Sequence, residues 1–81
     1  MTDFLEDIKD IISNQFGIPV DDIEEDSLLD EDLSIADLDL EDLMGQIQEK
    51  YDIEIPQEKF ISFKKVGDIV SYLYENIEPL V

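Results

Sequence analysis

The chain has 81 residues, the size of one small domain. Its 23 acidic residues and five lysines give a formal net charge of −18, which argues against nucleic acid or an anionic membrane surface as a partner. The chain contains no cysteine and no histidine, so it lacks a disulfide framework, a thiol nucleophile and the usual general base. We therefore expect a protein that is not an enzyme and whose partners present basic surfaces.

The N-terminal sequence MTDFLEDIKD has no basic region followed by an apolar run, and nowhere are there about 18 consecutive apolar residues. This pattern predicts neither a signal peptide nor a membrane span. We expect a cytoplasmic monomer with a single domain over residues 1–81.

The first predicted helix has signals at both ends. Thr2 or Asp3 can act as its N-cap, Gly17 stands where a C-terminal glycine is favoured, and Pro19 blocks continuation. Between these signals one helical face is apolar, and it consists of Phe4, Leu5, Ile8, Ile11, Ile12 and Phe16.

Residues 17–33 form a long connection in which aliphatic residues are interleaved with carboxylates. A disordered linker would carry fewer aliphatic side chains, so we expect this loop to pack onto the helices, with a short helical turn at Asp21 to Glu24. Its aliphatic residues are Ile18, Val20, Ile23, Leu28, Leu29 and Leu33.

The stretch from Asp30 to Ile55 predicts a helix with an apolar stripe on one side and an acidic face on the other. The stripe consists of Leu40, Leu43, Met44, Ile47 and Tyr51, with Leu38 near its edge. The acidic residues that fall largely off the stripe, and are expected in water, are Asp39, Glu41, Asp42 and Glu49.

Two starts of this helix fit the sequence. Ser34 and Asp37 form the Ser-x-x-acid pattern of a capping box, or Asp37 is itself the N-cap of a helix that begins later. Either arrangement places a carboxylate at the positive end of the helix dipole. At the other end, Pro56 disfavours helix at Ile55 and ends the element.

After Pro56, the segment QEKFISFKK predicts a short helix with Phe60 and Phe63 facing inward, and a last helix is expected from about Lys65 to Asn76, with Pro79 beyond its end. The apolar stripe of that last helix is Val66, Ile69, Val70, Leu73 and Ile77. The predicted fold class is all-α, a four-helix bundle with three long helices, one short helix and a long first loop.

The order of these segments resembles the acyl carrier protein family over nearly the whole chain. The resemblance is carried by Asp32-Leu33 before the acidic helix, Tyr-Asp-Ile-Glu-Ile-Pro at residues 51–56, and Val-Gly-Asp-x-Val-x-Tyr-Leu at residues 66–73. It implies a small acidic four-helix bundle with a 4′-phosphopantetheine arm on a serine at the start of the second helix. That serine normally lies in an Asp-Ser-Leu tripeptide, and the thiol of the arm carries the acyl group.

Counting back without a gap from residues 51–56 places Leu38 on the leucine of the tripeptide, Asp37 on its serine and Ala36 on its aspartate. Ser34 then occupies a place usually held by glycine. The arm is joined through a phosphodiester to a hydroxyl, which a carboxylate cannot replace in the usual way. The resemblance therefore implies 4′-phosphopantetheine for the family, and we expect residue 37 of this chain not to carry it.

Two alternatives keep the chain a genuine carrier of fatty-acid or polyketide-type synthesis. Either Ser34 is the acceptor, or a serine has been replaced at position 37. We favour capping as the role of Ser34, and capping or solubility as the role of Asp37. A further interpretation of Asp37 is a permanent negative charge that stands in for the attached phosphate.

The resemblance also implies that carboxylates along the second helix dock basic patches of partner enzymes. In this chain those residues would be Asp39, Asp42 and Glu49, with Leu38 as the apolar contact, while Gly45 stands where a bulky apolar residue is usual. We therefore predict a non-catalytic module that docks carrier-dependent synthases or a phosphopantetheinyl transferase. From charge alone, the alternative is an acidic interaction protein whose face serves solubility.

The candidate metal site in this acidic sequence is a calcium-binding loop. Four residues fall on ligand positions of the EF-hand template, namely Asp30, Asp32, Ser34 and Glu41. However, Ile35 occupies the position that requires glycine for the sharp turn. We predict no metal site, and loose binding of divalent cations by clustered charge remains the alternative.

Overall fold

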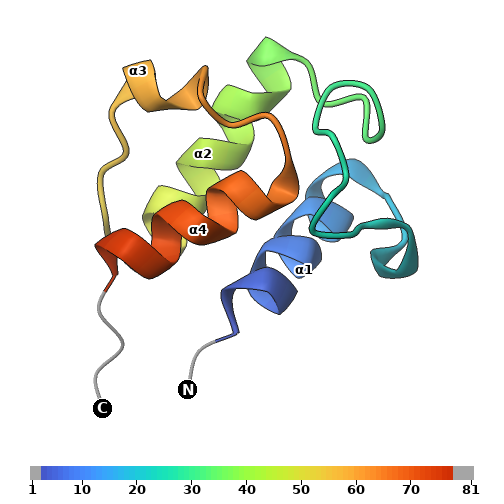
Figure 1. The fold of residues 1–81 in the computed structure, drawn as a ribbon, viewed down its shortest axis with the longest axis horizontal. Helices are drawn as coiled ribbons and strands as arrows, with labels where there is room; N and C mark the ends of the chain where they lie inside the picture. Colours follow the sequence, from blue (N-terminus) through green and yellow to red (C-terminus); the bar gives the residue numbers. More distant parts are fainter. Residues whose placement is uncertain (1–2, 78–81) are drawn as a thin grey trace.

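The computed structural model describes residues 3–77, and within that range the chain forms a bundle of α-helices (Figure 1). In chain order the elements are α1 (Phe4–Phe16), the 3₁₀ turn η1 (Val20–Asp22), α2 (Asp37–Tyr51), α3 (Gln57–Phe60) and α4 (Val66–Asn76). The described residues contain no strand, so the predicted all-α fold is confirmed. Thr2 and Pro79, which we assigned to helix ends, lie outside the described residues.

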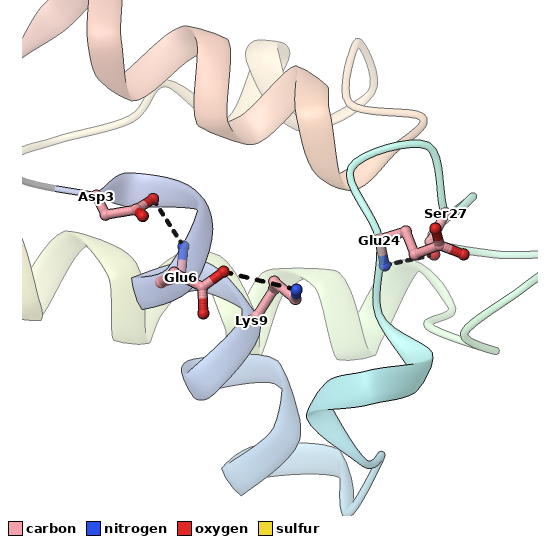
Figure 2. A network of polar contacts seen from close by, with 5 residues as sticks. All are labelled: Asp3, Glu6, Lys9, Glu24 and Ser27. Carbon is pink, nitrogen blue, oxygen red and sulfur yellow. Dashed lines mark hydrogen bonds and ion pairs between the residues drawn. The ribbon is translucent and has the colours of Figure 1, made fainter.

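Both predicted ends of α1 are confirmed. The Asp3 carboxylate accepts a hydrogen bond from the Glu6 N–H at 3.2 Å, as Figure 2 shows. At the other end Gly17 is left-handed, with φ 71°, and its N–H donates to the Ser13 carbonyl at 2.9 Å. Glycine suits this position because it has no Cβ to oppose a positive φ.

The long loop packs onto the helices as predicted, although its helical turn spans Val20–Asp22, so that it begins one residue earlier than expected and ends two residues before Glu24. Ile23, Leu29 and Leu33 are buried in it. The Ser27 hydroxyl accepts a hydrogen bond from the Glu24 N–H at 2.9 Å, which stabilises the turn between them (Figure 2).

The loop is bonded to the start of α4, a contact between segments far apart in sequence. The Val66 N–H donates to the Ser27 carbonyl at 3.0 Å, and the Gly67 N–H donates to the Glu25 carbonyl at 2.9 Å. In return the Leu29 N–H donates to the Lys64 carbonyl at 2.9 Å. The first N–H groups of a helix have no partner within it, so the loop supplies acceptors to this end of α4.

Neither predicted start of α2 is correct. The helix begins at Asp37 and its N-cap is Ala36, whose N–H donates to the Asp39 carboxylate at 3.4 Å. Ser34 cannot cap the helix because it lies two residues earlier, in a left-handed turn (φ 58°) where its N–H donates to the Asp30 carbonyl at 3.0 Å. Asp37 is the first helical residue rather than the cap, and Asp39 makes the return contact of a capping box.

The core lies between α1, α2 and α4, and α1 contacts both of the other long helices. Its buried helical residues are Phe4, Ile8, Ile12, Leu43, Met44, Ile47, Val66, Ile69, Val70 and Leu73. The short helix α3 packs against α2, and the inward placement of Phe63 is confirmed, while Phe60 is half-buried. This core fixes α2 with one long side toward solvent.

Candidate functional site

The solvent-facing side of α2 consists of two rows of residues spaced one helical turn apart, at intervals of four. The first row is Asp37, Glu41, Gly45 and Glu49, and all four residues are exposed. The second row is Leu38, Asp42, Gln46 and Lys50, again all exposed. We call these two rows the α2 face; its beginning and middle are acidic, and its one lysine stands in the last turn.

The α2 face contains three of the four residues that the resemblance assigned to docking. Leu38 and Asp42 are neighbours in one row, and Glu49 ends the other. Leu38 is 77% exposed, which leaves its apolar side chain available for contact. Asp39 lies apart from these rows: it is half-buried, and its carboxylate is bonded to the Ala36 N–H. Part of its role is therefore to cap the helix.

The start of α2 offers no hydroxyl where the resemblance places the attachment serine. Asp37 is exposed there, and a carboxylate cannot form the usual phosphodiester with 4′-phosphopantetheine. Ser34 has an exposed hydroxyl-bearing side chain, but it belongs to the left-handed turn before the helix. The residues at this end of α2 therefore do not fit the attachment of the group at residue 37.

A cavity of about 630 Å³ lies beside Asp37, between the first half of α2, α3 and the long loop. Sequence reasoning missed it, because its wall comes from three segments that meet only in the folded chain. The signal that could have pointed to it is the pair of phenylalanines at Phe60 and Phe63, both of which line it. Ile61 also lines it and is 76% exposed.

The described residues hold no candidate metal centre: between residues 3 and 77 there is no group of three or more side chains that could bind an ion together. Asp32, one of the residues on the calcium-loop template, instead accepts a hydrogen bond from the Leu28 N–H at 2.8 Å in a turn. In the same part of the chain, no helix combines the length and apolar character needed to cross a membrane.

Comparison with known proteins agrees with the resemblance. The family model described as "Phosphopantetheine attachment site" matches residues 6–73. An acyl carrier protein of Clostridium acetobutylicum is 37% identical over 73 residues, which cover 90% of this chain and 95% of that protein. Acyl carrier proteins of a Sulfurovum species and of Wolinella succinogenes are each 35% identical, over 89% and 88% of this chain and 95% and 93% of theirs. The chain therefore belongs to the acyl carrier protein family, whose members are carriers rather than enzymes.

Proposed function

We propose that this chain is an acyl-carrier-like module without an arm at residue 37, and that it docks basic partner enzymes through the α2 face. The observation that carries the proposal is Asp37. It is exposed at the first position of α2, where the family resemblance implies a serine, and it has no hydroxyl to modify. The acidic residues of the α2 face lie beside it and are exposed, so docking is the part of the family's role that these residues support.

The α2 face suits a partner that combines basic side chains with an apolar contact. Asp42 and Glu49 would attract the basic groups, and the exposed Leu38 would contact an apolar residue. Gly45 leaves the middle of the face without a side chain, and a Cβ built there meets nothing within 4 Å. Carrier-dependent synthases and a phosphopantetheinyl transferase are the partners that family membership suggests.

The test of loading is intact mass after incubation with a phosphopantetheinyl transferase and coenzyme A. We expect no change in mass for the natural chain, because residue 37 presents a carboxylate. A gain of one phosphopantetheine would contradict the proposal. Repeating the incubation with Ser34→Ala then identifies the acceptor, since loss of that gain would assign the arm to Ser34 and establish the alternative of a genuine carrier.

A gain-of-function variant tests the alignment that places Asp37 on the attachment serine of the family. Asp37→Ser places a hydroxyl at the first position of α2, directly before Leu38, and we expect it to become loaded under the same conditions. If Asp37→Ser stays unmodified, the double variant Ala36→Asp with Asp37→Ser, which restores the whole Asp-Ser-Leu tripeptide, separates the two explanations. Loading of the double variant alone would make Ala36 the obstacle, and failure of both would make the register wrong.

Docking is tested by charge reversal. Asp42→Lys with Glu49→Lys changes the α2 face, whereas Asp10→Lys with Glu75→Lys makes the same net-charge change at exposed positions of α1 and α4. Asp39 is left unchanged because its carboxylate also caps the helix. Titration against the transferase or a carrier-dependent synthase, at low and moderate salt, should show a large loss only for the first pair. Equal losses would show that net charge alone governs binding.

A further inference from the structure

Positive charge in this acidic chain is concentrated in residues 59–65, which comprise the end of α3 and its connection to α4; we call them the lysine segment. It contains three of the five lysines of the chain, Lys59, Lys64 and Lys65, and no carboxylate side chain. All three lysines are exposed. Their ammonium groups form no ion pair with any residue from 3 to 77, although the chain has 23 acidic residues. A partner molecule can therefore pair with them without breaking an ion pair of this part of the chain.

The lysine segment also exposes an apolar side chain. Ile61 is 76% exposed and stands between Lys59 and Lys64 in the sequence. Phe63 is part of the core and the half-buried Phe60 packs against it, so these two rings hold the segment on the body of the protein. A surface that combines exposed lysines with an exposed isoleucine fits a partner that presents carboxylates around an apolar contact.

The lysine segment lies beside the start of the α2 face. Ile61 and Lys64 line the same cavity as Asp37 and Glu41, which are the first two residues of one row of that face, and α3 packs against α2. In Figure 1 the start of α2, α3 and the connection to α4 all lie in the upper part of the view. A partner that covers the start of α2 therefore reaches the lysine segment as well.

We propose that the partner enzyme that docks the α2 face also presents carboxylates that contact Lys59 and Lys64, around an apolar side chain that contacts Ile61. This inference rests on the docking proposed above and specifies its partner, which is basic against Asp42 and Glu49 and acidic against the lysine segment. The net charge of −18 does not prevent the second contact, because salt screens charges that lie more than about 10 Å away at 0.1 M. A wholly basic partner would instead place its charges against unpaired lysines, which is unfavourable, so the two signs also fix the orientation of the partner.

The sign of one kind of substitution separates the two kinds of partner. Lys59→Gln and Lys64→Gln each make the chain more negative by one charge, so a wholly basic partner would bind both variants more tightly than the natural chain. The proposed partner should bind each about threefold more weakly, the effect of one surface ion pair. Lys9→Gln is the matched control, because it makes the same chemical change on α1, outside both surfaces, and it should not weaken binding.

The measurement is a titration at moderate salt against the carrier-dependent synthase used for the charge reversals of the α2 face, with NMR spectra of the free variants to verify that each is folded. Unchanged or tighter binding of the two lysine-segment variants would overturn this inference, as would equal weakening by Lys9→Gln. The charge reversals at Asp42 and Glu49 test the docking proposed above separately. Their loss of binding, without a loss in the lysine-segment variants, would leave that docking intact and refute only the acidic part of the partner.

The apolar contact is tested at Ile61. Ile61→Ser removes most of the exposed apolar surface of the lysine segment without changing its charge, and it should weaken binding of the same synthase about tenfold. Ile61→Val, which keeps most of that surface, is the control and should bind within about twofold of the natural chain. Equal binding by Ile61→Ser and the natural chain would overturn the proposed contact.

Cross-linking with a water-soluble carbodiimide gives an independent readout, because this reagent joins an amine directly to a carboxylate that touches it. In the complex with the synthase, Lys59 or Lys64 should be joined to aspartate or glutamate residues of the synthase, as identified by mass spectrometry after digestion. Lysines of the synthase that are joined to Asp42 or Glu49 report docking through the α2 face. Cross-links of this second kind without the first would overturn the inference and leave the proposed function standing.

Discussion

Asp52 ends α2 in the left-handed conformation, which glycine adopts at less cost than aspartate, although aspartate adopts it more readily than most other residues. Its backbone is left-handed, with φ 55°, and its N–H donates to the Gln48 carbonyl. Its negative charge also lies at the negative end of the helix dipole, which is unfavourable. We therefore predict that Asp52→Gly raises the free energy of unfolding by about 1 kcal/mol, measured by urea denaturation. Asp52→Asn, which removes only the charge, should give part of this gain, and no gain from glycine would show that the turn is unstrained.

Tyr51 should make stability depend on pH in the alkaline range. Its hydroxyl donates to the Asp7 carboxylate at 2.9 Å, and burial, followed by this hydrogen bond and the charge of Asp7, raises the pKa of Tyr51 above its ordinary 10.0. The folded state thus favours the neutral phenol, whereas the unfolded chain ionises near pH 10. The resulting stability is complete below about pH 10 and is lost as the pH rises toward the raised pKa.

The variant that checks this is Tyr51→Phe. At pH 7 it should lower the free energy of unfolding by about 1 kcal/mol, because the hydrogen bond is lost and Asp7 loses a partner. Above pH 10 the natural chain should lose stability more steeply than the variant. Parallel curves for the two proteins across pH 9 to 12 would show that the tyrosine does not carry the effect.

Two helices contain a glycine, and the two glycines should respond oppositely to alanine. At Gly45, exposed in the middle of α2, an added Cβ meets nothing within 4 Å, so Gly45→Ala should raise the free energy of unfolding by about 0.5–1 kcal/mol. At Gly67 in α4, the added Cβ would lie 2.9 Å from Glu25 Cγ and 3.1 Å from the Glu25 carbonyl oxygen.

The added Cβ at Gly67 would clash with the Glu25 carbonyl, which also accepts the hydrogen bond from the Gly67 N–H. The loop backbone at Glu25 therefore cannot move away from the Cβ without lengthening this hydrogen bond. We expect Gly67→Ala to be destabilising, by about 1 kcal/mol or more. Thermal unfolding of both variants compares them directly, and stabilisation by alanine at both positions would mean that the loop can shift away from α4.

The elements that sequence predicted well are those whose signals are local. Asp3 and Gly17 mark the ends of α1 because a cap is defined by side chains and backbone within a few residues of the helix. The start of α2 was mispredicted because its N-cap, Ala36, has no polar side chain and the return contact comes from Asp39. The positive φ of Ser34 gives a physical reason for a glycine in that place, which agrees with the register of the resemblance.

The candidate site could be predicted only in part, because helical spacing is a local signal whereas contacts between distant segments are not. Helical periodicity predicted that Asp42 and Glu49 face solvent, whereas Leu38 was expected near the edge of the apolar stripe and was joined to them as a docking residue only by the family resemblance. The cavity depends on how the loop and α3 are held against α2, and the hydrogen bonds between residues 25–29 and 64–67 that hold the loop are not encoded in any local pattern.

At the scale of the whole molecule, charge repulsion opposes the compact state. The chain carries a net charge of −18, and the ion pair that the described residues form is the contact between the half-buried Lys9 and the exposed Glu6, at 3.6 Å (Figure 2). Between Asp21 and Glu58 there are sixteen carboxylates and one lysine, Lys50. Folding brings these like charges closer than they are in the expanded chain, so their repulsion lowers stability.

Salt should therefore raise the melting temperature, since the Debye length falls to about 10 Å at 0.1 M and shortens further with more salt. Millimolar magnesium or calcium should raise it more steeply, because divalent ions screen clustered carboxylates more effectively than sodium does. Because residues 3–77 contain no group of three ligands that could hold one metal ion, the two divalent ions should act alike, without saturating at one equivalent. Thermal unfolding in sodium, magnesium and calcium chloride at matched ionic strength measures this. A saturable preference for calcium would reveal a specific site, and a flat response to all three salts would show that the carboxylates repel each other too weakly to affect folding.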